Sequence, residues 1–143
     1  MTDTLYSTTA TAWGGREGRV ESADKRLEVQ LSVPKALGGD DGPGTNPEQM
    51  FAAGYAACFH SALRAIARQQ KVDVSESAVS VTIGMVGSLA EGIDLAATIE
   101  AELPGVERDT ALALLAAAHQ GCPYSRATRG NIRAELTLVD TED

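Results

Sequence analysis

The chain has 143 residues, 43% of them hydrophobic, with twenty acidic against twelve basic residues and a formal net charge of −8. This composition fits a single globular domain over residues 1–143 and excludes a disordered chain. The acidic balance disfavours nucleic acid and anionic membrane surfaces as partners, because phosphates bind to basic faces. No stretch approaches the ~20 apolar residues that span a bilayer, and the N-terminus lacks a secretory pattern, so we expect a cytoplasmic protein.

The first third of the chain predicts three strands. Residues 5–13 are rich in Thr and alternate mildly, a glycine-rich turn follows over residues 14–18, and residues 19–22 form a second short strand. Residues 27–33 alternate strictly between apolar and polar, as is typical of a half-buried strand. Pro34 ends this strand, and residues 37–45 form a loop that lacks the Lys-Ser/Thr ending of a phosphate-binding loop.

Residues 46–70 are the longest apolar segment and predict a helix. Asn46 caps its first free N–H groups, Pro47 fits the first helical position, and Gln49 completes a box-like start. Apolar residues then recur at helical spacing, and Ala and Gly fill much of the remaining circumference. Because one chain has limited means to cover such a helix on all sides, we expect a partner subunit.

The second half of the chain predicts an antiparallel strand pair, a helix and a last strand. Residues 79–85 and 93–103 alternate and are joined through a turn at residues 87–92. A helix covers residues 108–120, with Gly121 and Pro123 as stop signals, and residues 132–138 form the last strand. The order β-β-β-α-β-β-α-β predicts an α+β domain.

The chain holds two cysteines. Cys58 lies in the middle of the first helix, and Cys122 lies just past the second helix, beside Pro123 and Tyr124, where a side chain reaches a pocket. In the cytoplasm such cysteines are more often free or catalytic than a structural disulfide. The alternative is that both are small buried hydrophobic residues, which is common for free cysteine.

A reactive cysteine needs a nearby cation or donor, because it reacts as its thiolate. Arg16 stands out because it lies in a glycine-flanked loop, and its planar fork suits a thiolate, a carboxylate or a peroxide oxygen. Glu48, in the first turn of the helix, is placed to hold that fork. The alternatives are a solvated turn residue for Arg16 and a simple helix N-terminal carboxylate for Glu48. The other candidate cations are Arg64, Arg68, Arg126 and Arg129.

A metal site is the competing interpretation of the cysteines. Together with His60 and His119, they make up the ligand set of a structural zinc site. Residues 58 and 60 point about 200° apart on a helix, so both cannot easily face one ion. The sequence therefore favours no metal and histidines that lie in the core or an interface with a hydrogen-bond partner.

Three stretches resemble the organic hydroperoxide resistance proteins, a branch of the OsmC superfamily. They are Gly14-Gly15-Arg16, the run GTNPEQMFAAGYAACFHSAL over residues 44–63, and the run AAHQGCPYSRATRGNI over residues 117–132. The resemblance implies a bacterial thiol peroxidase that reduces organic and lipid hydroperoxides to alcohols. It also implies an intertwined homodimer in which antiparallel sheets wrap central helices. No metal, haem or flavin is implied, and protein-bound dihydrolipoyl groups would recycle the enzyme.

The same resemblance implies roles for individual residues. Cys58 matches the peroxidatic cysteine and Cys122 the resolving one, while Arg16 matches the arginine that activates the thiolate and Glu48 the carboxylate that orients it. We expect three further side chains to bind the substrate, namely Phe51, Phe59 and Tyr124. Alternatives are a peroxidase of the OsmC branch with broader substrates, or a non-enzymatic dimer that is stabilised by zinc or binds a hydrophobic ligand.

The spacing of Glu48 and Cys58 bears on how such a site would be assembled. Ten residues on a straight helix separate them by ~15 Å along the axis and ~80° around it. One arginine cannot bridge both groups from a single subunit, so either the helix breaks near Gly54 or the Arg16–Glu48 pair meets Cys58 across a subunit interface. We expect the second arrangement.

Overall fold

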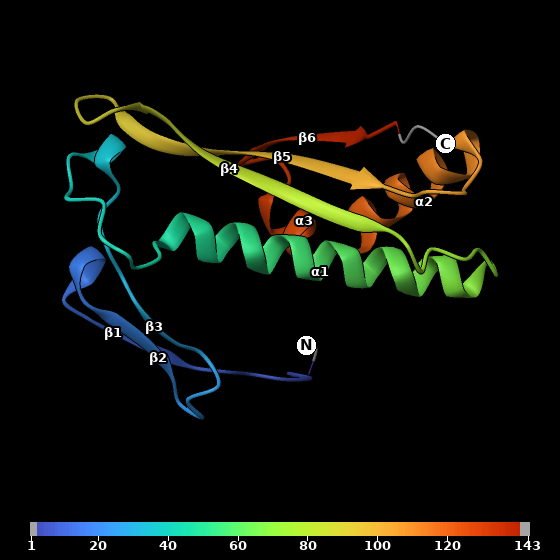
Figure 1. Cartoon of the computed structure of the whole chain (residues 1–143). Coiled ribbons are helices and arrows are strands. Elements are labelled where there is room, and N and C mark those ends of the chain that lie inside the picture. Colours follow the sequence, from blue (N-terminus) through green and yellow to red (C-terminus); the bar gives the residue numbers. More distant parts are fainter. Residues whose placement is uncertain (1–2, 141–143) are drawn as a thin grey trace. The chain divides into compact units, whose positions relative to one another are not determined.

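The computed structural model describes residues 3–140 and confirms the predicted α+β class (Figure 1). Its contacts gather the chain into an N-terminal unit, up to Met50, and a C-terminal unit, from Phe51 onward. Each unit contains one three-stranded sheet. The single domain over residues 1–143 and the homodimer both stay predictions.

The N-terminal unit is an antiparallel meander of β1 (Ala10–Trp13), β2 (Arg19–Ser22) and β3 (Glu28–Gln30). A 3₁₀ turn over Gly15–Glu17 joins β1 to β2, and a second covers Lys35–Leu37. β1 begins at residue 10 rather than at the predicted residue 5, because β2 offers only four residues to pair with. β3 is likewise shorter than predicted, and Leu31 instead makes a parallel bridge to Thr45.

The sheet of the C-terminal unit consists of β4 (Ala78–Ser88), β5 (Gly92–Glu102) and β6 (Arg133–Leu138). β4 and β5 pair along their whole length as the predicted antiparallel hairpin. The expected antiparallel pairing is present in both sheets, but it does not extend to β6, which pairs with β5 in parallel. The chain between them folds into helices that return it to the same end of the sheet, which is the crossover that a parallel pair requires.

Three helices follow the predicted pattern with one addition. They are α1 (Pro47–Gln69), α2 (Arg108–Gly121) and the short α3 (Pro123–Thr128). The predicted cap of α1 is confirmed, since the Gln49 N–H donates to Asn46 Oδ1 at 2.8 Å. α1 runs without a break through Gly54. α3 escaped prediction because Pro123 was interpreted as a stop, whereas proline also suits the first position of a helix.

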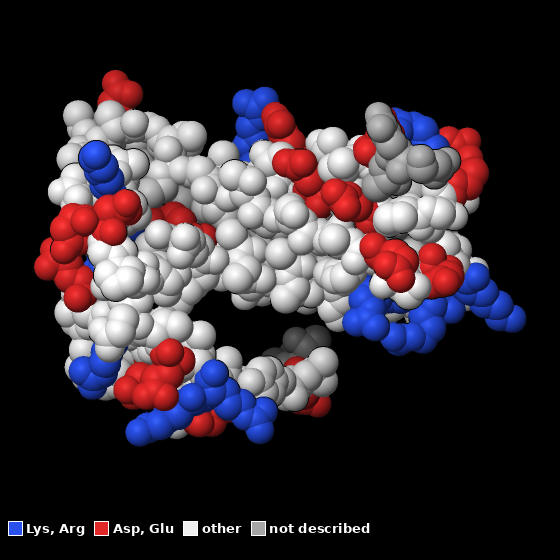
Figure 2. Space-filling model, in the orientation of Figure 1, with Lys and Arg blue, Asp and Glu red and all other residues white. Residues whose placement is uncertain are grey.

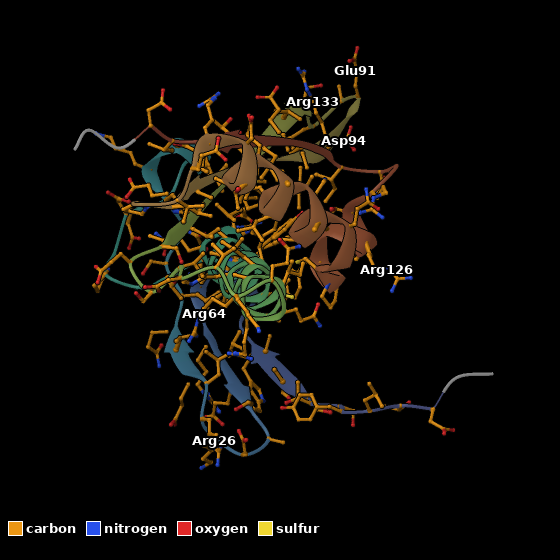
Figure 3. All side chains as sticks on the ribbon, turned by 90° about the vertical axis from the view of Figure 1, so that its right-hand side faces the viewer. Arg26, Arg64, Glu91, Asp94, Arg126 and Arg133 are labelled. Atoms are coloured by element: carbon orange, nitrogen blue, oxygen red, sulfur yellow. The ribbon has the colours of Figure 1, made fainter. Side chains whose placement is uncertain are left out.

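The core of the C-terminal unit forms between the sheet and one row of α1. Tyr55, Phe59 and Leu63 are fully buried at four-residue spacing, against Ile99 of β5 and Leu114 of α2. All three helices lie on the same side of this sheet (Figures 1 and 3). The opposite row of α1 is exposed in this chain and consists of small side chains, namely Ala53, Ala57, Ser61 and Ala65.

The surface of the C-terminal unit is uncharged over β4 and the middle of α1 (Figure 2). Neither residues 49–63 nor residues 78–88 include a charged side chain. Within residues 3–140, no helix is both long enough and apolar enough to cross a membrane.

Candidate active site

The N-terminal unit holds Arg16 and Glu48 in a two-pronged ion pair. Arg16 Nη1 donates to Glu48 Oε1 at 2.7 Å, and Arg16 Nη2 donates to Glu48 Oε2 at 3.0 Å. The Arg16 side chain is 37% exposed and that of Glu48 19%. The hydrogen bonds to Glu48 raise the pKa of Arg16, which keeps the guanidinium charged. Such parallel bonds fix the plane of the fork as well as its position.

The backbone around Arg16 explains how this turn presents the side chain. Gly14 and Gly15 have φ of 80° and 56°, a left-handed conformation that glycine adopts readily and other residues avoid. The Glu17 N–H donates to the Gly14 carbonyl at 3.1 Å and closes the 3₁₀ turn. Arg16 thus stands on a tight turn, and Glu48 on the first turn of α1.

The C-terminal unit brings the two cysteines together although 64 residues separate them. The Sγ atoms of Cys58 and Cys122 lie 3.6 Å apart and both thiols are free. Cys122 is fully buried, whereas Cys58 is partly exposed. A disulfide needs the sulfurs at about 2.05 Å, so the pair lies in contact but unbonded.

Cys122 reaches this position because it stands at a junction between helices. Its φ of −63° and ψ of 123° are extended, so it both ends α2 and precedes α3. Its N–H donates to the Ala118 carbonyl at 2.8 Å. Pro123, which has no N–H to leave unpaired, then starts α3.

Opposing effects act on the acidity of Cys58. Burial raises its pKa above the ordinary value, and the neighbouring Cys122 thiol raises it further. The backbone N–H of Tyr124 acts in the other direction by donating to the sulfur. Sequence reasoning missed this donor, because a backbone group carries no residue signature. Within the C-terminal unit the net effect keeps Cys58 protonated, so a thiolate there needs further positive charge.

Phe51 and Tyr124 lie together beside this region. Their rings meet edge to face, with centroids 6.2 Å apart. They line a hollow of about 350 Å³ together with Pro123, Ala127 and Thr128. Phe59 does not line it, because its side chain is fully buried in the core. A ligand in the hollow would therefore meet Phe51 and Tyr124 rather than Phe59.

The remaining candidate cations have other surroundings. Arg126 is exposed and extends outward from α3 (Figure 3). The Arg129 guanidinium donates to the His119 carbonyl at 2.8 Å, and Arg64 and Arg68 are exposed on α1. Of the five arginines considered from the sequence, Arg16 alone has a carboxylate partner among residues 3–140.

The two histidines are each bound to a serine hydroxyl. His60 Nε2 lies 2.9 Å from Ser77 Oγ, and His119 Nδ1 lies 2.8 Å from Ser125 Oγ. Burial lowers the pKa of both rings, and Arg64 and Arg129 respectively lower it further. In the described part of the chain, no three His, Cys, Asp or Glu side chains gather as a metal would require.

Comparison with known proteins places this arrangement in a family. The pattern of the OsmC-like proteins matches residues 38–137. The crystal structure of an organic hydroperoxide resistance protein OsmC from Legionella pneumophila superposes with a TM-score of 0.91 at 42% identity, covering 96% of this chain and all of that one. The chain therefore belongs to the OsmC-like proteins.

Curated relatives narrow the family further. An organic hydroperoxide resistance protein of Xanthomonas axonopodis pv. citri is 48% identical over 136 residues, which is 94% of this chain and 95% of the relative. The protein OhrA of Bacillus subtilis is 41% identical, covering 98% of this chain and all of the relative. Within the OsmC-like family, the chain belongs to the organic hydroperoxide resistance branch, as its motifs predicted.

The distance between the sulfurs predicts fast intramolecular oxidation. A mild two-electron thiol oxidant should convert Cys58 and Cys122 into a disulfide within one chain, because the sulfurs already touch. Non-reducing mass spectrometry of peptides would identify the bond. Cys58→Ser and Cys122→Ser are the controls, and each should leave one free thiol. Disulfides found mainly between chains would contradict the observed pairing.

Proposed function

We propose that this chain is a cysteine-based peroxidase that reduces organic hydroperoxides to alcohols and so protects the cell from oxidative stress. The observation that carries the proposal is the pairing of a partly exposed Cys58 with a fully buried Cys122, sulfur to sulfur at 3.6 Å. A substrate can reach the Cys58 sulfur from solvent, and the Cys122 sulfur lies buried in contact with it. The names of the relatives, which are organic hydroperoxide resistance proteins, support the substrate class.

The reaction would run in three balanced steps. The Cys58 thiolate attacks the outer peroxide oxygen, the O–O bond breaks, and the alkoxide leaves as an alcohol after taking up a proton. Cys58 is then a sulfenic acid. The Cys122 sulfur attacks the Cys58 sulfur, a disulfide forms, and the hydroxyl leaves as water. A dithiol reductant finally exchanges with this disulfide, restoring both thiols and becoming a disulfide itself.

Arg16 is proposed as the group that activates Cys58, and Glu48 as the group that orients Arg16. A guanidinium has five N–H donors, and the ion pair with Glu48 uses two of them. Within residues 3–140 the remaining donors make no hydrogen bond, so they could meet a thiolate or a peroxide oxygen. The added positive charge would offset the burial that raises the Cys58 pKa.

The hollow lined by Phe51 and Tyr124 is proposed to bind the organic part of the hydroperoxide. Its wall is apolar, and burying an alkyl chain contributes about 0.8 kcal/mol per CH₂. This burial energy would favour the binding of organic and lipid hydroperoxides over hydrogen peroxide, which has no carbon to bury. We propose a dihydrolipoyl group on a protein as the reductant, following the resemblance to the family.

The active unit is proposed to be a homodimer that shares its sites. The continuity of α1 through Gly54 supports this arrangement over a broken helix. The ten residues between Glu48 and Cys58 then span ~15 Å along one helix. We propose that Cys58 and Cys122 of one chain meet Arg16 and Glu48 of the other. The exposed row of small side chains on α1 suits close packing against a second copy.

The cysteine roles are tested by substitution. Cys58→Ser should abolish reduction of an organic hydroperoxide, because no sulfur remains to attack oxygen. Cys122→Ser should complete one fast turnover and stall as the sulfenic acid, which an electrophilic probe traps. Stopped-flow consumption of one equivalent of cumene hydroperoxide, with a thiol count, is the measurement. A wild-type chain that keeps both thiols would instead be a binding protein.

The activating role of Arg16 predicts a shift in pH dependence. In a Cys122→Ser background, Arg16→Ala should move the midpoint of Cys58 alkylation upward by about 1 to 3 pH units, because the opposite charge that favours thiolate is lost. Burial would then leave the pKa of Cys58 above the ordinary value. Arg16→Lys should restore it only in part, since a point charge lacks the fork.

The control for this shift is Arg64→Ala, which also removes a positive charge but from an exposed position on α1. It should leave the midpoint in place. Equal midpoints for Arg16→Ala and Arg64→Ala would remove Arg16 from the site.

The shared site predicts complementation. Alone, a Cys58→Ser chain should be inactive, and an Arg16→Ala chain should be strongly impaired at neutral pH. After subunit exchange, a heterodimer should regain one complete site, from the chain that keeps Cys58 and the chain that keeps Arg16, with about half of wild-type activity per dimer. Activity is measured after purifying the heterodimer through two different tags. A heterodimer without activity, although it demonstrably forms, would contradict the shared site.

A further inference from the structure

A buried chain of hydroxyl groups ties α3 to α1 beside the cysteines. The Tyr55 hydroxyl, from α1, lies 2.9 Å from Ser125 Oγ and 3.3 Å from Thr128 Oγ1, both on α3. Ser125 Oγ also lies 2.8 Å from His119 Nδ1, near the end of α2. Tyr55 and Ser125 are fully buried, and Thr128 is 4% exposed. The network thus joins three helices in the dry interior of one unit.

The residues of this hydroxyl network lie close to both cysteines in the sequence. Tyr55 precedes Cys58 by three residues on α1, which is nearly one turn. His119 and Ser125 stand three residues before and after Cys122. Their hydrogen bond therefore spans the junction at which Cys122 sits. Ser125 also follows Tyr124, whose N–H is the donor to Cys58.

If all four contacts are hydrogen bonds at the same time, one assignment of the protons satisfies them. Thr128 donates its only hydroxyl proton to the Ser125 carbonyl at 3.2 Å. Tyr55 must therefore donate to Thr128, and Ser125 must donate to Tyr55, because each hydroxyl has one proton. His119 is then left as the donor to Ser125, through Nδ1–H. The neutral ring carries its proton on Nδ1, and adding a second proton leaves the network intact.

We propose that Tyr55, Ser125, Thr128 and His119 are positioning residues for the reaction between Cys58 and Cys122. They touch neither substrate nor reacting sulfur. Instead they hold α3 against α1, so that Cys122 stays within reach of Cys58. Buried hydroxyl groups suit this task, because a wrong placement of α3 would leave them without partners in the interior.

The step that depends on this placement is attack of one sulfur on the other. A reaction within one chain is fast when the reacting atoms are held about 3 to 3.5 Å apart and aligned, and a misplacement of 1 Å costs on the order of a hundredfold. The 3.6 Å separation is near that range. Loosening α3 should slow disulfide formation while leaving both thiols in the chain.

The test is Tyr55→Phe, which removes one hydroxyl and keeps the ring. The rate of Cys58–Cys122 disulfide formation is followed after mixing with diamide, which takes two electrons and two protons from the thiols. We expect a fall of about tenfold or more. The matched control is Ser77→Ala, which also removes a hydroxyl with two hydrogen bonds, to His60 and the Val74 carbonyl, away from α3. It should keep the wild-type rate.

Two further variants test the direction of the bonds and guard against misfolding. His119→Asn keeps an N–H donor near the position of Nδ1 and should retain most of the rate of disulfide formation. His119→Ala has no such donor, so its rate should fall about as far as that of Tyr55→Phe. If Tyr55→Phe fails to fold, Ser125→Ala removes the same bond from the other side. Nitrogen NMR of His119 should show the Nδ1–H form in the neutral ring.

Equal diamide rates in wild type, Tyr55→Phe and Ser125→Ala would overturn the inference. This measurement uses no peroxide, so its result is independent of the proposed peroxidase function. The inference and the proposed function together also make a prediction for cumene hydroperoxide. Tyr55→Phe should accumulate Cys58 sulfenic acid and then sulfinic acid, because the attack of Cys122 on the Cys58 sulfur is slowed. A wild-type chain that forms the disulfide with diamide but not with hydroperoxide would contradict the proposed peroxidase alone.

Discussion

Side-chain packing between α1 and α3 is the constraint on which the pairing of the two cysteines depends. Gly54 makes it feasible, since a Cβ there would lie 2.9 Å from the Tyr124 hydroxyl and 3.4 Å from the ring. With no side chain at this position, the Tyr124 ring packs over the helix, with its centroid 5.7 Å from that of Tyr55. A larger residue would require the Tyr124 side chain to shift away from α1.

This packing disfavours the charged form of the Cys58 thiol. Burying Cys58 beside a second thiol protects the pair and brings the sulfurs together, yet it also raises the pKa of the thiol that has to ionise. One backbone N–H cannot reverse this effect. In the proposed mechanism, the ion pair of Arg16 and Glu48 would supply a cation whose plane is already fixed, so little conformational entropy would be lost when it meets an anion. Close packing and activation would then belong to different parts of the chain.

The sequence predicted the features that depend on local residue chemistry, such as helix ends. It did not predict the direction of strand pairing or contacts between residues far apart in the chain. The helix bounds were predicted to within a residue or two, because Asn46 and Pro47 at the start of α1 leave little choice. Alternation identified β6 but carries no direction, so its parallel pairing was missed. The Arg16 and Cys122 roles came from resemblance, since no spacing rule joins residues 64 positions apart.

The hydroxyl network shows why the rest of the site lay beyond sequence reasoning. Tyr, Ser, Thr and His are common, and their order here predicts only an apolar helix followed by a turn. Each becomes informative when α3 folds onto α1, because burial then forces every hydroxyl to find a partner and limits each to one donated proton. Cys122 lies at the only extended residue between two helices that the network clamps from both sides. The proposed resolving sulfur thus lies at the one residue between α2 and α3, with hydrogen-bonded groups on both sides of it.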